Sequence, residues 1–262
     1  MKIKDKLFTN TEGYVYPSTI IFRAIEFKFL IEKFGKVLSL KPAIDLGCGD
    51  GVAAKTIFNR KMEYGLDLDK LALEEAKKNG VYKKVFCSSA TKIPLGDKSV
   101  RLVFSNSSME HMRDIDGVLS EAARVSKKGG FLVFTVPTGN FKKYSVFSSL
   151  GLKRLARIYG KMRDKRLDHF HCYSLGEWTK RLKRHGFQVV DGYYYLDRKT
   201  IEYWDLLSWG HKLRLLVRGP SSGLRQMIYD KWLRESIYGY YKKAKVVKQG
   251  GAAVCVVAKR VG

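Results

Sequence analysis

Three glycines stand at alternate positions, Gly47, Gly49 and Gly51, between a short apolar run and a stretch that can form a helix. Glycine lets the backbone turn sharply and approach a ligand closely, and the first N–H groups of a helix lack partners within that helix. The spacing G-x-G-x-G differs from the G-x-G-x-x-G of dinucleotide-binding enzymes. A strand, a glycine turn and a helix in this order predict a corner of the chain that binds a nucleotide-like ligand.

An acidic residue strengthens this prediction. Asp67 ends a second apolar run that begins at Tyr64. An acid at the tip of the neighbouring strand, about 20 positions past the turn, can accept hydrogen bonds from both hydroxyls of a ribose. The alternative is a generic α/β turn with a surface aspartate. The motifs downstream favour the ligand-binding interpretation.

Those motifs resemble the class I S-adenosylmethionine-dependent methyltransferases, and among them the small-molecule branch of the methyltransferase type 11 kind. The similarity rests on DLGCGDG at 45–51, GLDLD at 65–69, Ile93-Pro94-Leu95, FSNSSMEHM at 104–112, EAARV at 121–125 and KGGFL at 128–132. It covers about Lys41 to Pro137, and more loosely His169 to Tyr195.

The resemblance implies S-adenosyl-L-methionine as cofactor, with the glycine turn around its methionine part and the acid after the second strand on its ribose. The implied cofactor-binding residues are Asp45, Gly47, Cys48, Gly49, Asp67, Leu68, Ser89, Ala90 and Asn106. Two positions depart from the family. Ser89 stands where the family usually has an aspartate for the adenine amino group, and Val100-Arg101 where it usually has Phe-Asp. A serine hydroxyl or the neighbouring backbone can still meet the adenine edge.

Strands and helices alternate at βαβ spacing from Pro42 onward, which predicts a mostly parallel sheet with helices on both faces. We expect strands at 42–47, 62–67, 84–88, 100–105 and 130–136, and helices at 51–60, 70–79 and 115–127. Later strands at 188–196 and 252–259 complete, by resemblance, a Rossmann-like α/β sheet of seven strands with an antiparallel last strand. Ligands of such sheets bind beyond the carboxyl ends of the strands, where Gly47, Asp67, Ser89 and Asn106 are expected to converge.

Three regions follow from this interpretation. Residues 1–40 form an N-terminal arm and a lid helix, with Tyr14 and Tyr16 expected over the cofactor or simply packed. Residues 41–196 with 252–262 form the methyltransferase core. Residues 197–251 form a basic, aromatic, helical insert before the last strand, for which contact with a membrane surface, a cap over the acceptor site and nucleic-acid binding all stay open.

The net charge of +25 is spread unevenly. Residues 1–140 hold 23 Lys and Arg against 16 Asp and Glu, whereas residues 141–262 hold 27 against 9. The positive electrostatic potential of the second half would attract nucleic acid, anionic lipid or a phosphorylated substrate. A solvated surface that is merely rich in lysine would give the same excess of Lys and Arg. The charged start and the four scattered cysteines predict a cytoplasmic protein with reduced thiols. Its oligomeric state stays open.

Methyl transfer chiefly requires that donor and acceptor meet, and an oxygen acceptor of high pKa gains from a nearby base. The candidate bases are His111, after the fourth strand, and His169 and His171, on the loop before the sixth. His111 can alternatively only orient its loop. His169, His171 and Cys172 are metal-ligand types, but no second cluster with zinc-like spacing exists in the sequence, so we predict no metal.

The sequence therefore predicts a methyltransferase that most resembles enzymes acting on the oxygen of a small-molecule, sugar or lipid-linked metabolite, with peripheral contact to an anionic membrane as an open feature. One alternative is an RNA or protein methyltransferase, which the basic second half suggests. The Ser105-Asn106-Ser107-Ser108 segment argues against it, because base-amino enzymes carry Asn/Asp-Pro-Pro-aromatic there. A second alternative is a cofactor-binding but inactive interaction module.

Overall fold

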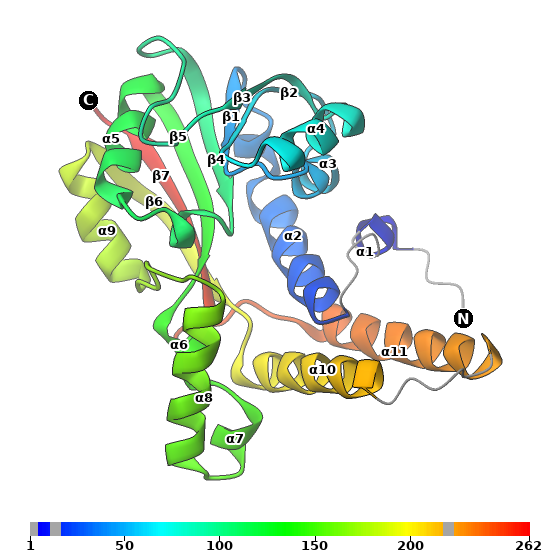
Figure 1. Ribbon diagram of the computed structural model, residues 1–262. Helices are drawn as coiled ribbons and strands as arrows, with labels where there is room; N and C mark the ends of the chain where they lie inside the picture. The colour runs from blue at the N-terminus through cyan, green and yellow to red at the C-terminus, as the bar shows by residue number, and fades with distance from the viewer. Residues whose placement is uncertain (1–4, 11–16, 217–222) are drawn as a thin grey trace.

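Seven strands form one sheet in the order β3-β2-β1-β4-β5-β7-β6 in the computed structural model, which describes residues 5–10, 17–216 and 223–262 (Figure 1). The strands are β1 (Ala43–Leu46), β2 (Met62–Asp67), β3 (Tyr82–Cys87), β4 (Val100–Asn106), β5 (Ser126–Pro137), β6 (Phe187–Tyr195) and β7 (Ala253–Arg260). Strands β1 to β5 pair in parallel, and β7 runs antiparallel to both β5 and β6. This arrangement confirms the predicted Rossmann-like fold. Tyr14 and Tyr16 lie outside the described residues.

Side chains of the central strands alternate between two apolar layers, because successive residues of a strand point to opposite faces. On β5, Val133 packs into a layer with helix α2 (Pro17–Leu38), while Leu132 and Phe134 pack into the layer on the other face. The first layer also receives α3 (Val52–Ile57), α4 (Lys70–Asn79) and α11 (Gly223–Lys243). The second receives α5 (Ile115–Val125) and α9 (Leu175–Arg184). The central strands are therefore covered on both faces.

Side-chain caps fix the starts of several helices. Asp69 accepts the backbone N–H groups of Leu71 and Ala72 at the start of α4, and Ser174 forms a reciprocal capping box with Glu177 at the start of α9. The junction after α5 differs from our expectation of a helix to 127 and a strand from 130. Helix α5 ends at Val125 and β5 begins at Ser126, because an irregular register between β4 and β5 lets Ser126 pair with Val100.

The segment after β5 forms three helices, α6 (Gly139–Lys143), α7 (Val146–Ser149) and α8 (Lys153–Arg166) (Figure 1). In the sequence, the spacing of Leu150, Leu152, Leu155 and Ile158 predicts an apolar face of one helix. Leu150 and Leu152 instead precede α8, and all four side chains are exposed. Helix α8 packs through Ala156, Gly160 and Arg163. It approaches α6 so closely that a Cβ on Gly160 would lie 2.1 Å from the carbonyl oxygen of Lys142.

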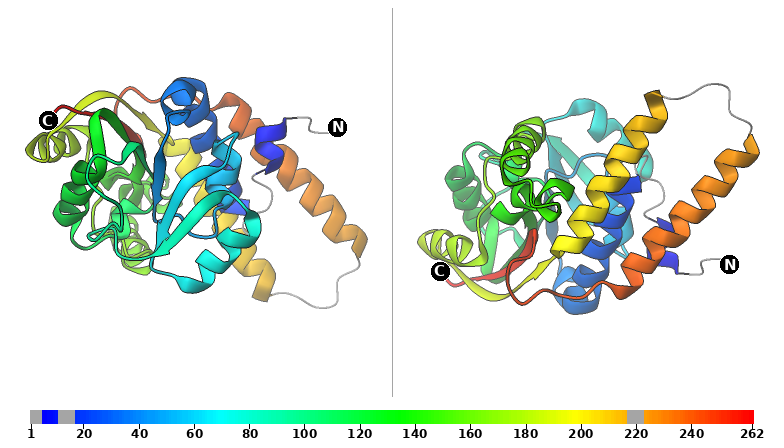
Figure 2. Two further views of the ribbon diagram at one scale, coloured as in Figure 1. Left: turned by 90° about the horizontal axis from the view of Figure 1, so that it is seen from above. Right: turned by 90° about the horizontal axis from the view of Figure 1, so that it is seen from below.

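Two long helices, α10 (Arg198–Leu216) and α11, connect β6 to β7. Both lie beside α2 and extend away from the sheet (Figure 2). A short helix, α1 (Lys6–Asn10), packs on α2 near the N-terminus. Among the described residues, no helix combines the length and the apolar character that crossing a membrane requires.

A buried ion pair joins α8 to α10. Arg163 Nη1 lies 2.9 Å from Asp205 Oδ1, with the two side chains 0% and 1% exposed. Arg163 also donates to the carbonyl oxygens of Phe141 and Tyr144, and Tyr159 donates its hydroxyl to Asp205. These bonds satisfy charges that would be costly to bury unpaired.

Removing one partner of this pair should destabilise the chain strongly. Asp205→Ala leaves Arg163 charged and buried, so we expect the free energy of unfolding to fall by about 3–5 kcal/mol in urea denaturation. Glu202→Ala on the same helix removes an exposed pair with Arg198 and should change it by no more than about 1 kcal/mol. Equal effects of the two variants would contradict the assigned role of the buried pair.

Candidate active site

The glycine turn between β1 and α3 is held against the end of β2. Gly47 N–H donates to the Leu66 carbonyl at 2.8 Å, and Gly49 N–H donates to Asp67 Oδ2 at 2.8 Å. Gly47 has φ +70°, and a Cβ there would lie 2.5 Å from Ser108 Cβ. Only glycine fits this position, because both the backbone angle and the approach of Ser108 exclude a side chain.

The Asp67 carboxylate accepts hydrogen bonds from the backbone of the turn and can accept more from a ligand. Its Oδ1 accepts the N–H of Asp69 at 2.9 Å while its Oδ2 accepts that of Gly49. Each carboxylate oxygen can accept more than one hydrogen bond. The carboxylate is thus oriented by the backbone and can still accept hydroxyl donors, as a ribose requires.

A cavity of about 610 Å³ opens beyond the carboxyl ends of the parallel strands. It is lined by Gly47, Leu66, Asp67, Leu68, Ser88, Ser89, Ala90, Thr91, Ser108, His111, Met112, Arg113, Asp114 and Val118. Six of the predicted site residues thus come together: Gly47, Asp67, Leu68, Ser89, Ala90 and His111. The hydroxyls of Ser89 and Thr91 lie 2.7 Å apart, so the cavity carries polar groups where the family usually has an aspartate.

Asp45, Cys48 and Gly49 do not line this cavity but underlie it. Asp45 is buried, and its Oδ2 accepts the hydroxyl of Tyr82 at 2.7 Å, whereas its Oδ1 has no hydrogen-bond partner. Burial raises the pKa of Asp45 to about 7. Burial likewise raises the pKa of the Cys48 thiol, so Cys48 is a neutral packing residue. The unpartnered carboxylate oxygen of Asp45 and the close turn at Gly47 fit a ligand that brings a positive charge, as the methionine part of the expected cofactor does.

A smaller pocket of about 200 Å³ adjoins this cavity through His111, which lines both. Its walls come from α2, the loop after β4, the start of α6, the loop before His169 and α10. They consist of Thr19, Phe22, Arg23, Ser107, Glu110, His111, Pro137, Phe141, Leu167, His169 and Trp204. We call it the acceptor pocket. Its aromatic side chains suit the apolar faces of a ring or a sugar.

Two histidines and a glutamate meet at this pocket. The rings of His111 and His169 lie 5.3 Å apart, and His111 Nε2 lies 3.8 Å from Glu110 Oε1. His111 Nδ1 lies 3.1 Å from the carbonyl oxygen of Asp168, to which it can only donate, so its Nε2 is left as the proton acceptor. Burial and the nearby His111 lower the pKa of His169, which keeps that ring neutral near pH 7.

Glu110 was not among the predicted site residues. It is buried, its Oε2 has no hydrogen-bond partner, and burial raises its pKa to about 8. It is therefore protonated at neutral pH and can act as a proton donor. Its position next to His111 in the FSNSSMEHM segment was visible in the sequence, but its burial was not.

Asn106 and His171 lie apart from the acceptor pocket lining. Asn106 donates to Thr135 Oγ1 at 2.7 Å and accepts from Arg23 Nη1 at 3.1 Å. His171 Nε2 lies 2.9 Å from the carbonyl oxygen of Met112, and its Nδ1 lies 3.2 Å from the hydroxyl of Tyr173. Both ring nitrogens of His171 are thus engaged, and the contact with Met112 holds the loop that carries His111.

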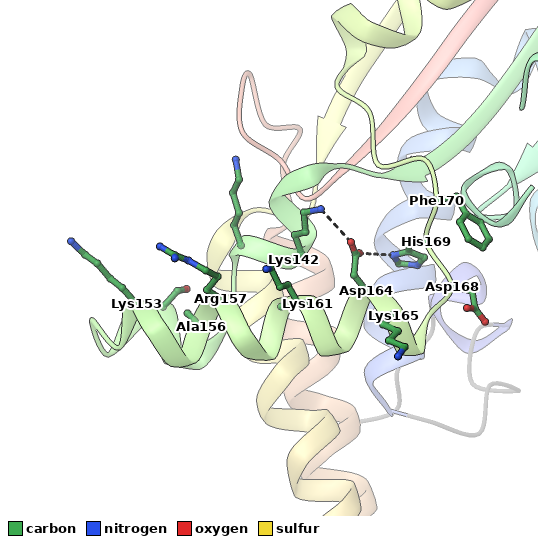
Figure 3. Close-up of a pocket in the computed structure, with 13 residues that line it drawn as sticks. Lys142, Lys153, Ala156, Arg157, Lys161, Asp164, Lys165, Asp168, His169 and Phe170 are labelled. Carbon is green, nitrogen blue, oxygen red and sulfur yellow. Dashed lines mark hydrogen bonds and ion pairs between the residues drawn. The ribbon is translucent and has the colours of Figure 1, made fainter. Parts of the chain in front are cut away.

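Potential metal ligands do gather here, in two sets that share His169. They are Glu110, His111 and His169, and Asp164, His169 and Cys172, with ligand atoms of each set within 4.8 Å of one another. Lys142 Nζ lies 3.3 Å from Asp164 Oδ2 and already neutralises that carboxylate (Figure 3). Burial and the charge of Asp164 raise the pKa of Cys172 to about 12. These contacts disfavour a metal at the second set, and the absence of a metal from this site stays a prediction.

Helix α2 is fixed over the strand ends by a buried carboxylate. Glu26 accepts from Arg23 at 2.7 Å, from Ser107 Oγ at 3.1 Å and from the hydroxyl of Tyr195. Burial alone would raise the pKa of Glu26, but Arg23 and Tyr195 outweigh it, so the pKa is lowered. The sequence analysis expected α2 to be a lid helix but did not identify Glu26, whose partners lie on α2 itself, directly after β4 and at the end of β6.

Residues 44–134 match the family model described as a methyltransferase domain. The chain is 29% identical over 154 residues to a probable S-adenosylmethionine-dependent methyltransferase of Mycolicibacterium smegmatis, covering 58% of this chain and 53% of that protein. It is 29% identical over 130 residues to a ubiquinone biosynthesis O-methyltransferase of Nitrosomonas europaea, covering 46% and 54%. The matched part thus spans about half the length of these relatives.

The fold also resembles solved structures. A possible histamine N-methyltransferase of Thermotoga maritima superposes with a TM-score of 0.58 at 20% identity, covering 97% of this chain and 99% of that one. At this identity the likeness concerns the fold alone.

Loss of the Asp67 carboxylate should weaken cofactor binding. Asp67→Ala removes charge-assisted hydrogen bonds, so we expect the binding of S-adenosylhomocysteine in calorimetry to weaken by about 1.5–3 kcal/mol. Asp191→Ala, on β6 and remote from the cavity, serves as control and should bind normally. Equal affinities of all three proteins would refute the ribose assignment.

Glu110 should make stability depend on pH in a defined direction. Its folded-state pKa of about 8 exceeds the value of about 4.3 for an unfolded chain, so the folded state keeps a proton that the unfolded state has lost. This contribution is fully present below the unfolded pKa and is lost as pH rises through the folded pKa. The variant Glu110→Gln cannot ionise, so it lacks this loss of stability. The difference in unfolding free energy, variant minus parent, should therefore rise between pH 5 and 8 by at most about 1.4 kcal/mol per pH unit.

Glu177→Gln is the matched control for this measurement. The hydroxyl and backbone N–H of Ser174 lower the pKa of the exposed Glu177, which is therefore ionised in both states throughout this window. Its effect in urea denaturation should not vary from pH 5 to 8. A constant difference for Glu110→Gln as well would show that Glu110 is already ionised.

Proposed function

Because the chain carries a class I S-adenosylmethionine-dependent methyltransferase domain, we propose that it transfers a methyl group from this cofactor to an oxygen of a small-molecule, sugar or lipid-linked acceptor. The observation that supports this best is the position of His111, which lines both the cofactor cavity and the acceptor pocket. The Nitrosomonas europaea relative is itself named as an O-methyltransferase.

The residues of the cavity fit the cofactor. The backbone-oriented carboxylate of Asp67 would hold the ribose, the turn at Gly47 and Cys48 would surround the methionine part, and Ser89 and Ala90 would face the adenine. When bound, S-adenosylmethionine supplies a methyl group on a positively charged sulfur that is ready for displacement.

The acceptor pocket supplies positioning and proton transfer. Phe22, Phe141 and Trp204 would fix the acceptor and exclude water, which raises the effective concentration of the reacting oxygen. His111 Nε2 is free to take the hydroxyl proton, because Nδ1 is engaged with Asp168. The imidazolium that forms lies 3.8 Å from Glu110 Oε1, an oxygen that can stabilise its positive charge. The neutral His169 would orient the acceptor or take over as base.

We further propose a cytoplasmic protein that touches an anionic membrane at its periphery. All four cysteines are free thiols, as a reducing compartment permits. Trp209 and Trp232, on α10 and α11, are 46% and 62% exposed, and Leu206 is exposed as well. Exposed tryptophans on basic helices are typical of interfacial elements. The division into arm, core and insert, 197–251, stays a prediction.

Membrane contact should appear as cosedimentation with phosphatidylglycerol vesicles at low salt and should weaken with phosphatidylcholine vesicles. Trp232→Ala should reduce it, because tryptophan contributes apolar area at the head-group level. Leu71→Ala changes an exposed apolar residue of α4, far along the chain from the insert, and should leave binding unchanged. An absence of vesicle binding would leave the insert as a cap over the acceptor pocket.

The histidines should affect turnover more than cofactor binding. Methyl transfer from radiolabelled cofactor into lipid, RNA, protein and small-molecule fractions identifies the acceptor class. On that acceptor, His111→Ala should lower kcat by about a hundredfold or more, as expected for loss of a general base. His169→Ala should lower it less, and His185→Ala, next to Asp116 on α5, should not.

Normal binding of S-adenosylhomocysteine by each histidine variant shows that the cofactor cavity is intact. A chain that binds the cofactor but labels no fraction would be the inactive module instead. Labelling confined to RNA or protein would equally overturn the proposed acceptor class.

A further inference from the structure

A second large cavity, of about 740 Å³, runs along α8 (Figure 3). Six basic side chains line it: Lys142, Lys143, Lys153, Arg157, Lys161 and Lys165. The acidic residues of its lining are Asp164 and Asp168, and Asp164 is already paired with Lys142 at 3.3 Å. We call this cavity the basic groove. Its lining carries an excess of positive charge.

Helix geometry places this charge in one row. Lys153, Arg157, Lys161 and Lys165 follow one another at intervals of four residues, so successive side chains of the row are neighbours on the surface of α8, and all four line the groove. Like charges at this spacing repel one another. In the described part of the chain, none of these four forms an ion pair with a carboxylate. The row is therefore uncompensated by the protein itself, which favours an anionic ligand.

The floor of the groove is rigidly built. Ala156 and Gly160 are small, and Gly160 permits the contact of α8 with the backbone of Lys142. Arg163 is buried beneath and engaged with Asp205, so it fixes α8 without competing for a ligand. The basic side chains thus project from a helix whose position is set by packing.

Shared lining residues connect the groove to the reaction site. His169 lines both the basic groove and the acceptor pocket, and His111 lines both the acceptor pocket and the cofactor cavity. The three cavities adjoin one another in that order. A molecule with its anionic part beside Arg157 and Lys161 can extend past His169 toward the atoms that react.

We propose that the basic groove binds the diphosphate group of the methyl acceptor, an inference that rests on the proposed function and narrows its substrate class. Lys165 lies twelve helical steps after Lys153, or about 18 Å along the helix, which exceeds what a single phosphate needs. Linked phosphates can engage several of these cations at once through charge-assisted hydrogen bonds. The diphosphate can belong to a soluble nucleotide-linked acceptor or to a lipid-linked one.

Calorimetry with inorganic diphosphate as the probe tests the groove directly. In low salt and with saturating S-adenosylhomocysteine, the variant K153Q/R157Q/K161Q should bind diphosphate at least about tenfold more weakly than the parent. The control K180Q/K183Q/R184Q removes the same number of charges from exposed positions of α9 and should bind like the parent. Equal weakening in both variants would mean that only net charge matters, and unchanged binding in both would place diphosphate elsewhere; either result overturns the proposal.

Competition distinguishes the two sources of the diphosphate. Uridine diphosphate glucose tests the soluble source, and a polyprenyl diphosphate sugar in phosphatidylcholine vesicles tests the lipid-linked one. Displacement of inorganic diphosphate by either supports the groove, whereas equal displacement by uridine or by polyprenol, which lack the phosphates, overturns it. S-adenosylhomocysteine binding is measured in the same samples. If the parent protein binds S-adenosylhomocysteine but no diphosphate, only the groove proposal is refuted. If the parent protein fails to bind S-adenosylhomocysteine, the proposed function is refuted.

Discussion

The acceptor side of the molecule depends on one buried carboxylate, that of Glu26 on α2. A charge inside an apolar layer is tolerated only when it is paired and hydrogen-bonded. Arg23, Ser107 and Tyr195 meet that requirement from α2 itself, from the end of β4 and from the end of β6. These directional bonds tie α2 to the ends of β4 and β6. Because α2 contributes Phe22 and Arg23 to the acceptor pocket, the shape of that pocket follows from the Glu26 contacts.

A second buried ion pair performs the same task for the other half of the pocket. Arg163 and Asp205 join α8 to α10, and Arg163 also binds the carbonyl oxygens at the end of α6. Phe141 of α6 and Trp204 of α10 both line the acceptor pocket, and the Arg163 guanidinium lies 4.6 Å and 5.4 Å from their ring centres. The pocket thus lies between two clusters of buried charge. A buried ion pair is weak evidence for stability, so we assign these pairs a role in fixing the geometry of the pocket.

Features that depend on residues close in the sequence could be predicted, and features that depend on contacts between distant segments could not. The glycine turn, Asp67 and the caps at Asp69 and Ser174 depend on neighbours a few residues away or on one adjacent strand, so their patterns are legible in the sequence. Glu26 and Glu110 acquire their character from partners or burial supplied by distant segments, and they were missed. The expected apolar face of the 150–158 stretch was wrong, because α8 packs through Ala156, Gly160 and Arg163 and leaves Leu155 and Ile158 exposed.

The small residues on the packing face of α8, Ala156 and Gly160, let this helix approach α6 closely. A bulky face would hold α8 away from α6 and separate Lys142 from Asp164, which lie 3.3 Å apart. Asp164 also lies 3.3 Å from His169 Nδ1, so the contact of α8 with α6 brings the basic row to the edge of the acceptor pocket. The small side chains at Ala156 and Gly160 thereby link two features that lie apart in the sequence, the cations of α8 and the histidine that follows it. An anionic group bound on α8 would raise the pKa of His169 through its negative charge, and this couples occupancy of the groove to the protonation of the acceptor pocket.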